Sequence, residues 1–156
     1  MEAKRPKMSI FPTKILLATD GSAQAQYAEQ VAAELADETG SELHVGCVEV
    51  VPYFPQYSAG MVVGHDRELY EKIEEEARET LRKLTWQAKV AGGAVAEDHL
   101  RMGAPGEEIV RLAEAIGAGL IVMGSRGRGG MKRALMGSVS DSVVRCAHCP
   151  VLVVRP

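Results

Sequence analysis

Residues 124–138, GSRGRGGMKRALMGS, combine five glycines with four basic side chains directly after the apolar run LIVM. Gly124 and Gly127 can adopt positive φ angles and let the backbone approach a ligand closely, and successive amides in such a loop form a nest that binds anions. Gly137 and Ser138 then open a helix, whose unpaired N–H groups and dipole favour a phosphate. The stretch therefore predicts a phosphate-binding loop, and the alternative is a plain turn with solvated basic side chains.

The basic side chains of this stretch are Arg126, Arg128, Lys132 and Arg133, and they stand in a chain whose net charge is −3. Two well-known phosphate loops do not match it. The pattern G-x-x-x-x-G-K-[ST] is absent, and G-x-G-x-x-G does not follow the first strand candidate. The sequence thus supports neither a P-loop NTPase nor a dinucleotide-dependent dehydrogenase.

Strand-like and helix-like segments alternate along the chain. The strand candidates are 14–19, 41–51, 94–102, 120–123 and 150–156, and helices are expected after Ser22, over 66–91, from Pro105 and from Ser138. This alternation predicts a single α/β domain, a five-stranded parallel sheet that is doubly wound and Rossmann-like, with helices on both faces. Segment 94–102 is the most polar strand candidate and is expected nearer a sheet edge. Right-handed crossovers limit the topologies but leave the strand order open.

Local signals define several of these elements more closely. Ser22 is a candidate N-cap and Gly40 a stop signal for the first helix, and Ser138 with Asp141 has the spacing of a capping box. The helix over 66–91 has an apolar stripe of Leu69, Ile73, Ala77, Leu81, Leu84 and Ala88. Its opposite face offers the i,i+4 pairs Glu68–Lys72, Glu74–Arg78 and Glu79–Lys83, which we interpret as a solvated face.

Open α/β sheets bind ligands beyond the carboxyl ends of their strands, where the strand order reverses. Thr19, Asp20 and Gly21 follow the first strand, and Val48 with Glu49 closes the second. Together with the glycine-rich loop after the fourth strand, they predict a nucleotide site. An acidic side chain there would meet a ribose or an adenine, and backbone amides would meet the phosphates.

Composition excludes several other functions. A chain of 156 residues with 46% hydrophobic side chains predicts one domain over 1–156, with 1–12 as a flexible extension. Only 4% of the residues are aromatic and the net charge is negative, so neither stacking on single strands nor general duplex binding is expected. No apolar run approaches the roughly 20 residues of a membrane span, and the N-terminus lacks the core of a signal peptide. We expect a cytoplasmic protein that binds neither nucleic acid nor membranes.

The cysteines and histidines offer little chemistry by pattern. Cys146 and Cys149 form a C-x-x-C at the end of a predicted helix, not at its start, so a pair of small apolar side chains is favoured over a redox or metal site. The four histidines, His44, His65, His99 and His148, are scattered along the chain and are interpreted as structural. No catalytic residue and no protein metal ligand is assigned.

The spacing Gly124-x2-Gly127-x9-Gly137-Ser138 resembles the ATP-binding motif of the universal stress protein family. The resemblance extends over nearly the whole chain, through ILLATDGS, GAPGEEIVRLAEAIGAGLIVMGSRGRGG and GSVSDSVVRCAHCPVLVV. It implies an adenine nucleotide alpha hydrolase-like fold and places the chain in the subgroup that binds ATP. Two positions depart from the family pattern, Gly119 for an acidic residue and Cys47 for a histidine, and neither touches the predicted phosphate site.

The resemblance implies a role for individual residues. Asp20 and the Val48 backbone would contact adenine, and Ala18 and Gly124 would lie near the ribose. The phosphates would be held by Gly127, Gly137, Ser138 and Val139, with Thr19, Met123 and Arg126 completing the site. The ligand would be ATP, with ADP or AMP as alternatives. Mg²⁺ or Mn²⁺ would be held through the phosphates, because the loop offers no carboxylate.

Family members usually form dimers through the last strand, and the apolar VLVV would invite pairing if it lay at a sheet edge. A homodimer through Val151 to Val154 is therefore predicted. Tyr53, Phe54 and Tyr57 in the loop 52–65 would cover the adenine or fill a dimer contact, and the second role is favoured.

Three functions remain open. The first is an ATP-binding regulatory module of the stress response, with slow or no hydrolysis and an unknown protein partner. The second is an enzyme, an ATP hydrolase or a nucleotidyl transferase, for which no base is evident beside the glycine-rich loop. The third is a dimeric scaffold without a ligand.

Overall fold

The structure is a computed structural model that describes residues 9–51, 64–127 and 136–156, without the side chains of 64–66. Several side chains singled out in the sequence lie outside the described residues: Tyr53, Phe54, Tyr57, His65, Arg128, Lys132 and Arg133. Within the described part of the chain, no helix combines the length and the hydropathy needed to cross a bilayer.

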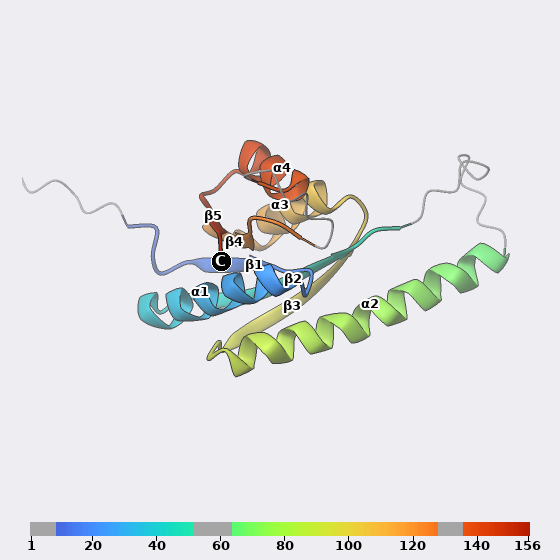
Figure 1. Cartoon of the computed structure of the whole chain (residues 1–156), viewed down its shortest axis with the longest axis horizontal. Coiled ribbons are helices and arrows are strands. Elements are labelled where there is room, and N and C mark those ends of the chain that lie inside the picture. The colour runs from blue at the N-terminus through green and yellow to red at the C-terminus, as the bar shows by residue number, and fades with distance from the viewer. Residues whose placement is uncertain (1–8, 52–63, 128–135) are drawn as a thin grey trace, which may run out of the picture.

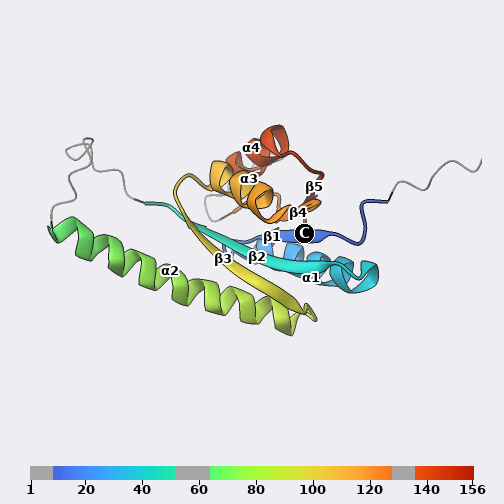
Figure 2. The ribbon, with the colours of Figure 1, turned by 180° about the vertical axis from the view of Figure 1, so that it is seen from behind.

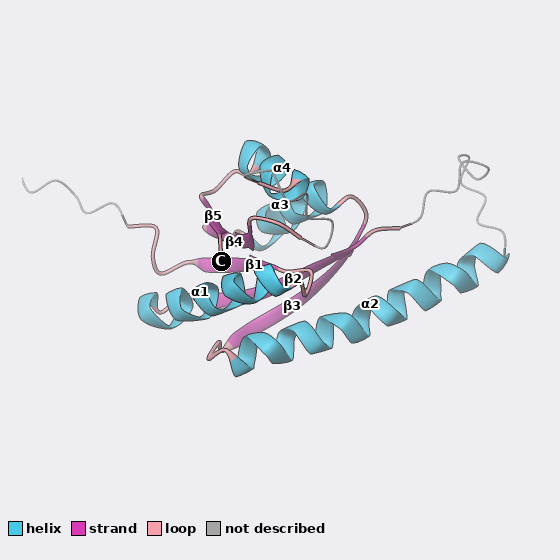
Figure 3. Cartoon of the chain, viewed as in Figure 1, coloured by secondary structure: helices cyan, strands magenta, loops and turns pink. Residues whose placement is uncertain are grey.

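Five strands and four helices alternate along the described chain (Figure 3). Their bounds are β1 Lys14–Ala18, α1 Ala23–Thr39, β2 Glu42–Glu49, α2 Gly64–Val90, β3 Val95–Met102, α3 Pro105–Ile116, β4 Leu120–Gly124, α4 Ser138–Cys146 and β5 Val151–Val154. Each expected element is present, and the bounds differ from the expected ones by one or two residues at most ends.

The strands form one parallel sheet in the order β3-β2-β1-β4-β5. The chain moves outward from β1 to β3 and then returns to add β4 on the other side of β1. The strand order therefore reverses between β1 and β4, where Ala18 lies level with Met123. The edge position expected for the polar third strand is confirmed, and β5 forms the other edge.

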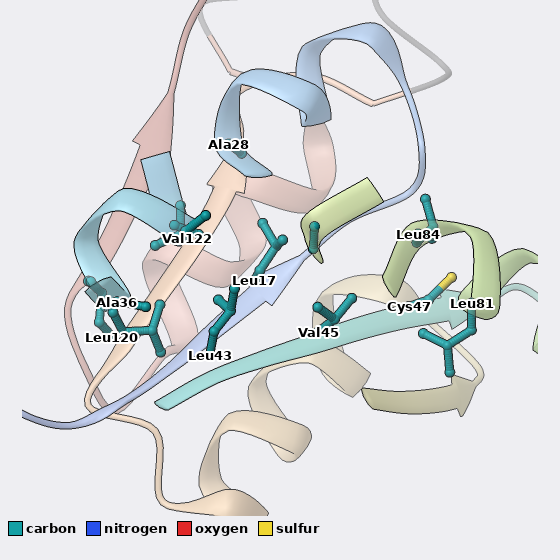
Figure 4. Packing of buried hydrophobic residues seen from close by; sticks show 14 residues of the cluster. Leu17, Ala28, Ala36, Leu43, Val45, Cys47, Leu81, Leu84, Leu120 and Val122 are labelled. Carbon is teal, nitrogen blue, oxygen red and sulfur yellow. The ribbon is translucent and has the colours of Figure 1, made fainter. Parts of the chain in front are cut away.

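Helices cover both faces of the sheet, with α1 and α2 on one side and α3 and α4 on the other (Figures 1 and 2). Alternate β1 residues divide between the two faces, because successive strand side chains point in opposite directions. Ile15 and Leu17 pack with α1 and α2 (Figure 4), and Leu16 and Ala18 pack with α3 and α4. The centre of the sheet is thus buried on both faces, as expected of a doubly wound fold, whereas edge strand β3 is partly exposed.

Helix α1 begins and ends where its sequence predicts. The Ser22 hydroxyl accepts a hydrogen bond from the Ala25 amide at 3.2 Å, which satisfies one N–H group of the first turn. Gly40 ends the helix in the left-handed conformation, with φ of 65°.

Helix α2 departs from the pattern that its sequence predicts. Its N-terminal part extends past the sheet (Figure 1), so Leu69 is 41% exposed, and burial begins only at Ala77. Of the expected ion pairs, Glu74–Arg78 forms at 2.7 Å. The predicted pair Glu79–Lys83 is wrong, because Glu79 forms its ion pair with Arg82 instead. These pairs are exposed and contribute little to stability.

Candidate functional site

A cavity of about 520 Å³ opens at the carboxyl ends of β1, β2 and β4, where the strand order reverses. We call it the strand-end cavity. The structure brings all eleven candidate site residues together in its lining: Ala18, Thr19, Asp20, Val48, Met123, Gly124, Arg126, Gly127, Gly137, Ser138 and Val139. Its volume lies within the range of about 300–1,000 Å³ that is usual for small-molecule sites.

The motif glycines Gly124 and Gly127 differ in how much room a side chain would have, and neither has a positive φ angle. The expectation of positive φ angles at these two positions is therefore wrong. A Cβ atom at Gly127 would run into the Asp20 carboxylate, and one at Gly124 would lie 3.4 Å from the carbonyl oxygens of Gln24 and Arg126. A side chain at Gly127 would therefore displace the Asp20 carboxylate, whereas a Cβ atom at Gly124 would make ordinary van der Waals contact with the backbone.

Helix α4 begins at the cavity with its first amides uncapped by a side chain. Gly137 is the N-cap and Ser138 the first helical residue, so the predicted capping box of Ser138 and Asp141 is wrong. Asp141 instead accepts a hydrogen bond from Arg145 at 3.0 Å. The first turn of α4 therefore presents backbone N–H groups and the positive end of the helix dipole to the cavity.

Ser140 and Ser125 fix the entry to this helix. The Ser125 carbonyl accepts hydrogen bonds from the Gly137 amide at 2.6 Å and from the buried Ser140 hydroxyl at 2.9 Å. The Ser125 amide in turn donates to the Val154 carbonyl of β5 at 2.9 Å. The two ends of the glycine-rich segment are thereby held together and tied to the edge of the sheet.

A buried carboxyl stands behind the end of β1. Glu29 of α1 is 3% exposed and accepts a hydrogen bond from the Thr19 hydroxyl at 3.1 Å. Burial raises the pKa of Glu29, the Thr19 hydrogen bond partly offsets this, and the Asp20 carboxylate raises the pKa further. The Asp20 carboxylate accepts from the Ser22 amide at 2.9 Å, which fixes the turn into α1.

The cavity also includes residues outside the candidate set. Glu49 and Val50 extend its wall past β2, Thr80 reaches it from α2, and Pro105 and Ile109 reach it from α3. The sequence already marks Glu49 as a residue near the site, because it closes the second strand. The contributions of α2 and α3 follow only from how the helices pack, and no local pattern in the sequence marks them.

Two of the histidines interpreted as scattered are in contact. His44 Nδ1 lies 3.0 Å from His99 Nε2, and His44 Nε2 lies 3.1 Å from a carboxylate oxygen of Glu42. Neither histidine lines the strand-end cavity. The partners come from neighbouring strands but are 55 residues apart in the chain, so a search for local motifs misses the pair.

The C-x-x-C cysteines differ in exposure, with Cys146 exposed and Cys149 partly buried. Cys146 and Cys149 are free thiols, and Cys149 packs against the α3–α4 side of the core. Burial raises the pKa of the Cys149 thiol, which disfavours the thiolate that redox chemistry needs.

Comparison with known proteins agrees with this geometry. The sequence model of the universal stress protein family matches residues 12–155. Universal stress protein MJ0531 of Methanocaldococcus jannaschii is 38% identical over 144 residues, which are 91% of this chain and 81% of that relative. The solved structure of MJ0577 from the same organism has a TM-score of 0.76 at 31% identity, over 94% of this chain and 97% of that chain.

A third comparison concerns a protein with a ligand. The universal stress protein from Archaeoglobus fulgidus that was solved in complex with dAMP has a TM-score of 0.63 at 27% identity, over 94% of this chain and 100% of that chain. Family model, relative and structures agree over more than nine tenths of the chain. The chain therefore belongs to the universal stress protein family.

Proposed function

We propose that this chain binds ATP in the strand-end cavity and acts as a regulatory module of the stress response. The single observation that carries the proposal is the convergence of the three motif glycines and the uncapped start of α4 on one cavity at the reversal of strand order. The dAMP complex of the Archaeoglobus fulgidus relative supports an adenine nucleotide.

The adenosine would occupy the part of the cavity near β1 and β2. Ala18, Val48 and Ile109 supply apolar surface there, and a base needs such surface to leave water. The Val48 backbone and Asp20 are assigned to the adenine. Ala18 and Gly124 are assigned to the ribose from the family resemblance, and both line the cavity.

The phosphates would lie at the start of α4. Gly127 and Gly137 are the close-approach positions, and the Ser138 and Val139 amides belong to the uncapped first turn. Arg126 adds positive charge to the wall of the cavity. Mg²⁺ or Mn²⁺ would accompany the triphosphate through its own oxygens.

Slow or absent hydrolysis follows from the groups near the cavity. No histidine among the described residues lines it, and its carboxylates there are Asp20 and Glu49. Asp20 is already engaged by the Ser22 amide. A base that activates water must reach the attacking water beside the terminal phosphate, and this lining offers no group dedicated to that task. The nucleotide is therefore proposed to regulate a protein partner through differences in affinity between states.

We also propose that the chain forms a homodimer through Val151 to Val154. Strand β5 lies at an edge of the sheet, and Leu152 at its centre is 37% exposed. An unpaired apolar edge strand favours pairing with a second copy. The Ser125–Val154 hydrogen bond would then connect the dimer contact to the glycine-rich segment. Sedimentation of the chain and of Leu152→Asp tests this contact.

Calorimetric titration with ATP, ADP and AMP in the presence of Mg²⁺ tests the proposed ligand. The parent protein should bind ATP, Gly137→Val should lose binding while remaining folded, and Ala91→Val at the exposed end of α2 should bind as the parent does. An enzyme would instead release phosphate within minutes and stop when Asp20 is changed to Asn. A scaffold would bind none of the three nucleotides, and that result would refute the proposal.

A further inference from the structure

Four side chains on β2 and β3 converge on the face of the sheet that carries α3 and α4. His44 lies level with Glu97 in the parallel register, and Gly46, whose Cβ position faces Leu112 of α3, lies level with His99. Partners in register share a face, so His44, Glu97 and His99 project to the same side. Together with Glu42 these residues form what we call the histidine cluster. We propose that the histidine cluster binds a zinc ion through His44, His99 and Glu97.

The hydrogen bonds of His44 prepare one nitrogen as a ligand. An ionised carboxylate only accepts hydrogen bonds, so the His44 Nε2 that lies 3.1 Å from Glu42 carries the proton. In that tautomer the lone pair of His44 is on Nδ1, which accepts a hydrogen bond from His99 Nε2 at 3.0 Å. His99 must carry its proton on Nδ1 instead before its Nε2 can bind a metal. A metal-bound histidine typically donates its second N–H to a carboxylate, which fixes the tautomer and raises the basicity of the ligand nitrogen. Glu42 is placed to accept that bond.

The distances suit a tetrahedral ion after a small adjustment. Zinc–nitrogen bonds of about 2.0–2.1 Å at a tetrahedral angle separate two nitrogens by roughly 3.4 Å, and the two histidine nitrogens are 3.0 Å apart. One ligand atom from each of His44, His99 and Glu97 lies within 4.8 Å of the others. The two histidine nitrogens must therefore separate by a few tenths of an ångström, and the half-buried His99 is the ring with more room to move. Water would supply the fourth ligand.

The surroundings favour a transition metal with access from solvent. His44 is 3% exposed, which holds one ligand rigidly, whereas Glu97 is exposed and gives an ion a path to the cluster. Two imidazoles and one carboxylate match zinc better than magnesium or calcium, which prefer oxygen ligands alone.

This site is separate from the proposed nucleotide site. His44, Glu97 and His99 do not line the strand-end cavity. His44 lies near the start of β2, whereas the cavity includes Gly46 and the residues up to Val50. The zinc proposal therefore does not depend on whether the chain binds a nucleotide.

Titration of nucleotide-free protein with zinc chloride against a chromophoric chelator tests the proposal. The titration is made on a Cys146→Ser, Cys149→Ser background, because thiolates also bind zinc. The informative variants are His99→Gln and Glu97→Gln, since His99 is half-buried and Glu97 exposed and both should fold. The matched controls are His148→Gln and Glu68→Gln, which change an exposed histidine and an exposed glutamate elsewhere. Thermal melts check that each variant is folded.

We expect the background protein to bind one zinc ion per chain. His99→Gln and Glu97→Gln should each weaken binding by about tenfold or more, and the two controls should bind as the background does. Absence of zinc binding once the two cysteines are replaced would overturn the proposal. Binding that survives His99→Gln but fails in His148→Gln would overturn it as well.

Discussion

The glycine-rich wall of the strand-end cavity is built from backbone, whereas the histidine cluster consists of side chains. In the cavity, glycines at 124, 127 and 137 let chain segments pass close together and leave helix amides toward the centre. In the cluster, imidazoles and carboxylates meet across two strands. A site made of backbone tolerates little added volume, and a site made of side chains depends on the identity of each group. Different substitutions should therefore abolish ligand binding at the strand-end cavity and at the histidine cluster.

The largest expected effect is at Gly127. A Cβ atom there would collide with the Asp20 carboxylate at the cavity wall, so Gly127→Val should reduce nucleotide affinity by about 100-fold or more, which corresponds to roughly 2.7 kcal/mol. Calorimetry with ATP and Mg²⁺ measures the loss, and a thermal melt checks the fold. Affinity equal to that of the parent would show that close approach of the backbone is not what binds the ligand.

Ser140→Ala should have the next largest effect. The substitution removes a buried hydroxyl that donates to the carbonyls of Ser125 and Gly137, at 2.9 and 3.0 Å. Loss of such bonds costs about 1–2 kcal/mol of unfolding free energy, and nucleotide affinity should fall because the entry to α4 loosens. Urea denaturation measures the stability, with Ser142→Ala on the same helix as the control. An unchanged midpoint would mean that these bonds do not stabilise the fold.

Glu29→Gln should stabilise the protein at neutral pH. The pKa of Glu29 is raised in the folded state, so its contribution to stability is fully present below about 4.5 and is lost as pH rises through the folded pKa. Glutamine keeps an acceptor for the Thr19 hydroxyl and needs no ionisation, so we expect a gain on the order of 1 kcal/mol at pH 7. Melts at pH 4 and pH 7 measure the difference. A variant that is less stable than the parent at pH 7 would refute this account of Glu29.

The smallest expected effect is that of His99→Gln on nucleotide binding. His99 does not line the strand-end cavity, although its register partner Gly46 does, so its side chain is not expected to touch the nucleotide. The variant should bind ATP with the affinity of the parent, within about twofold, and Gly127→Val should in turn leave zinc affinity unchanged. A large loss of ATP binding in His99→Gln would show that the two sites are coupled.

The sequence predicts the backbone-built site better than the side-chain cluster, for a physical reason. The predicted phosphate loop depends on glycines at fixed short spacings, and Gly124, Gly127 and Gly137 show that spacing within one segment. The contact between His44 and His99 depends on which strands become neighbours and in what register. Local patterns set neither of these, so the two histidines had no signal that linked them.

Errors within the fold have similar causes. Ser138 has the right residue type for an N-cap, but the helix starts one residue earlier than a capping box allows, with Gly137 as the cap. Leu69 continues an apolar stripe, but the sheet ends before it, and the helix extends past its core. Residue propensities predict that these helices exist. Tertiary packing determines at which residue a helix starts and which of its side chains are buried.

The central claim is tested most directly by identifying what the purified protein carries. The protein is denatured as isolated from cells, and the released small molecules are identified and counted per chain. A tight site retains its ligand, since the bound state is stabilised by ligand in excess of Kd. ATP or ADP near one per chain is the predicted result. A chain that releases no adenine nucleotide, and whose melting temperature does not change when ATP and Mg²⁺ are added, would contradict the proposal.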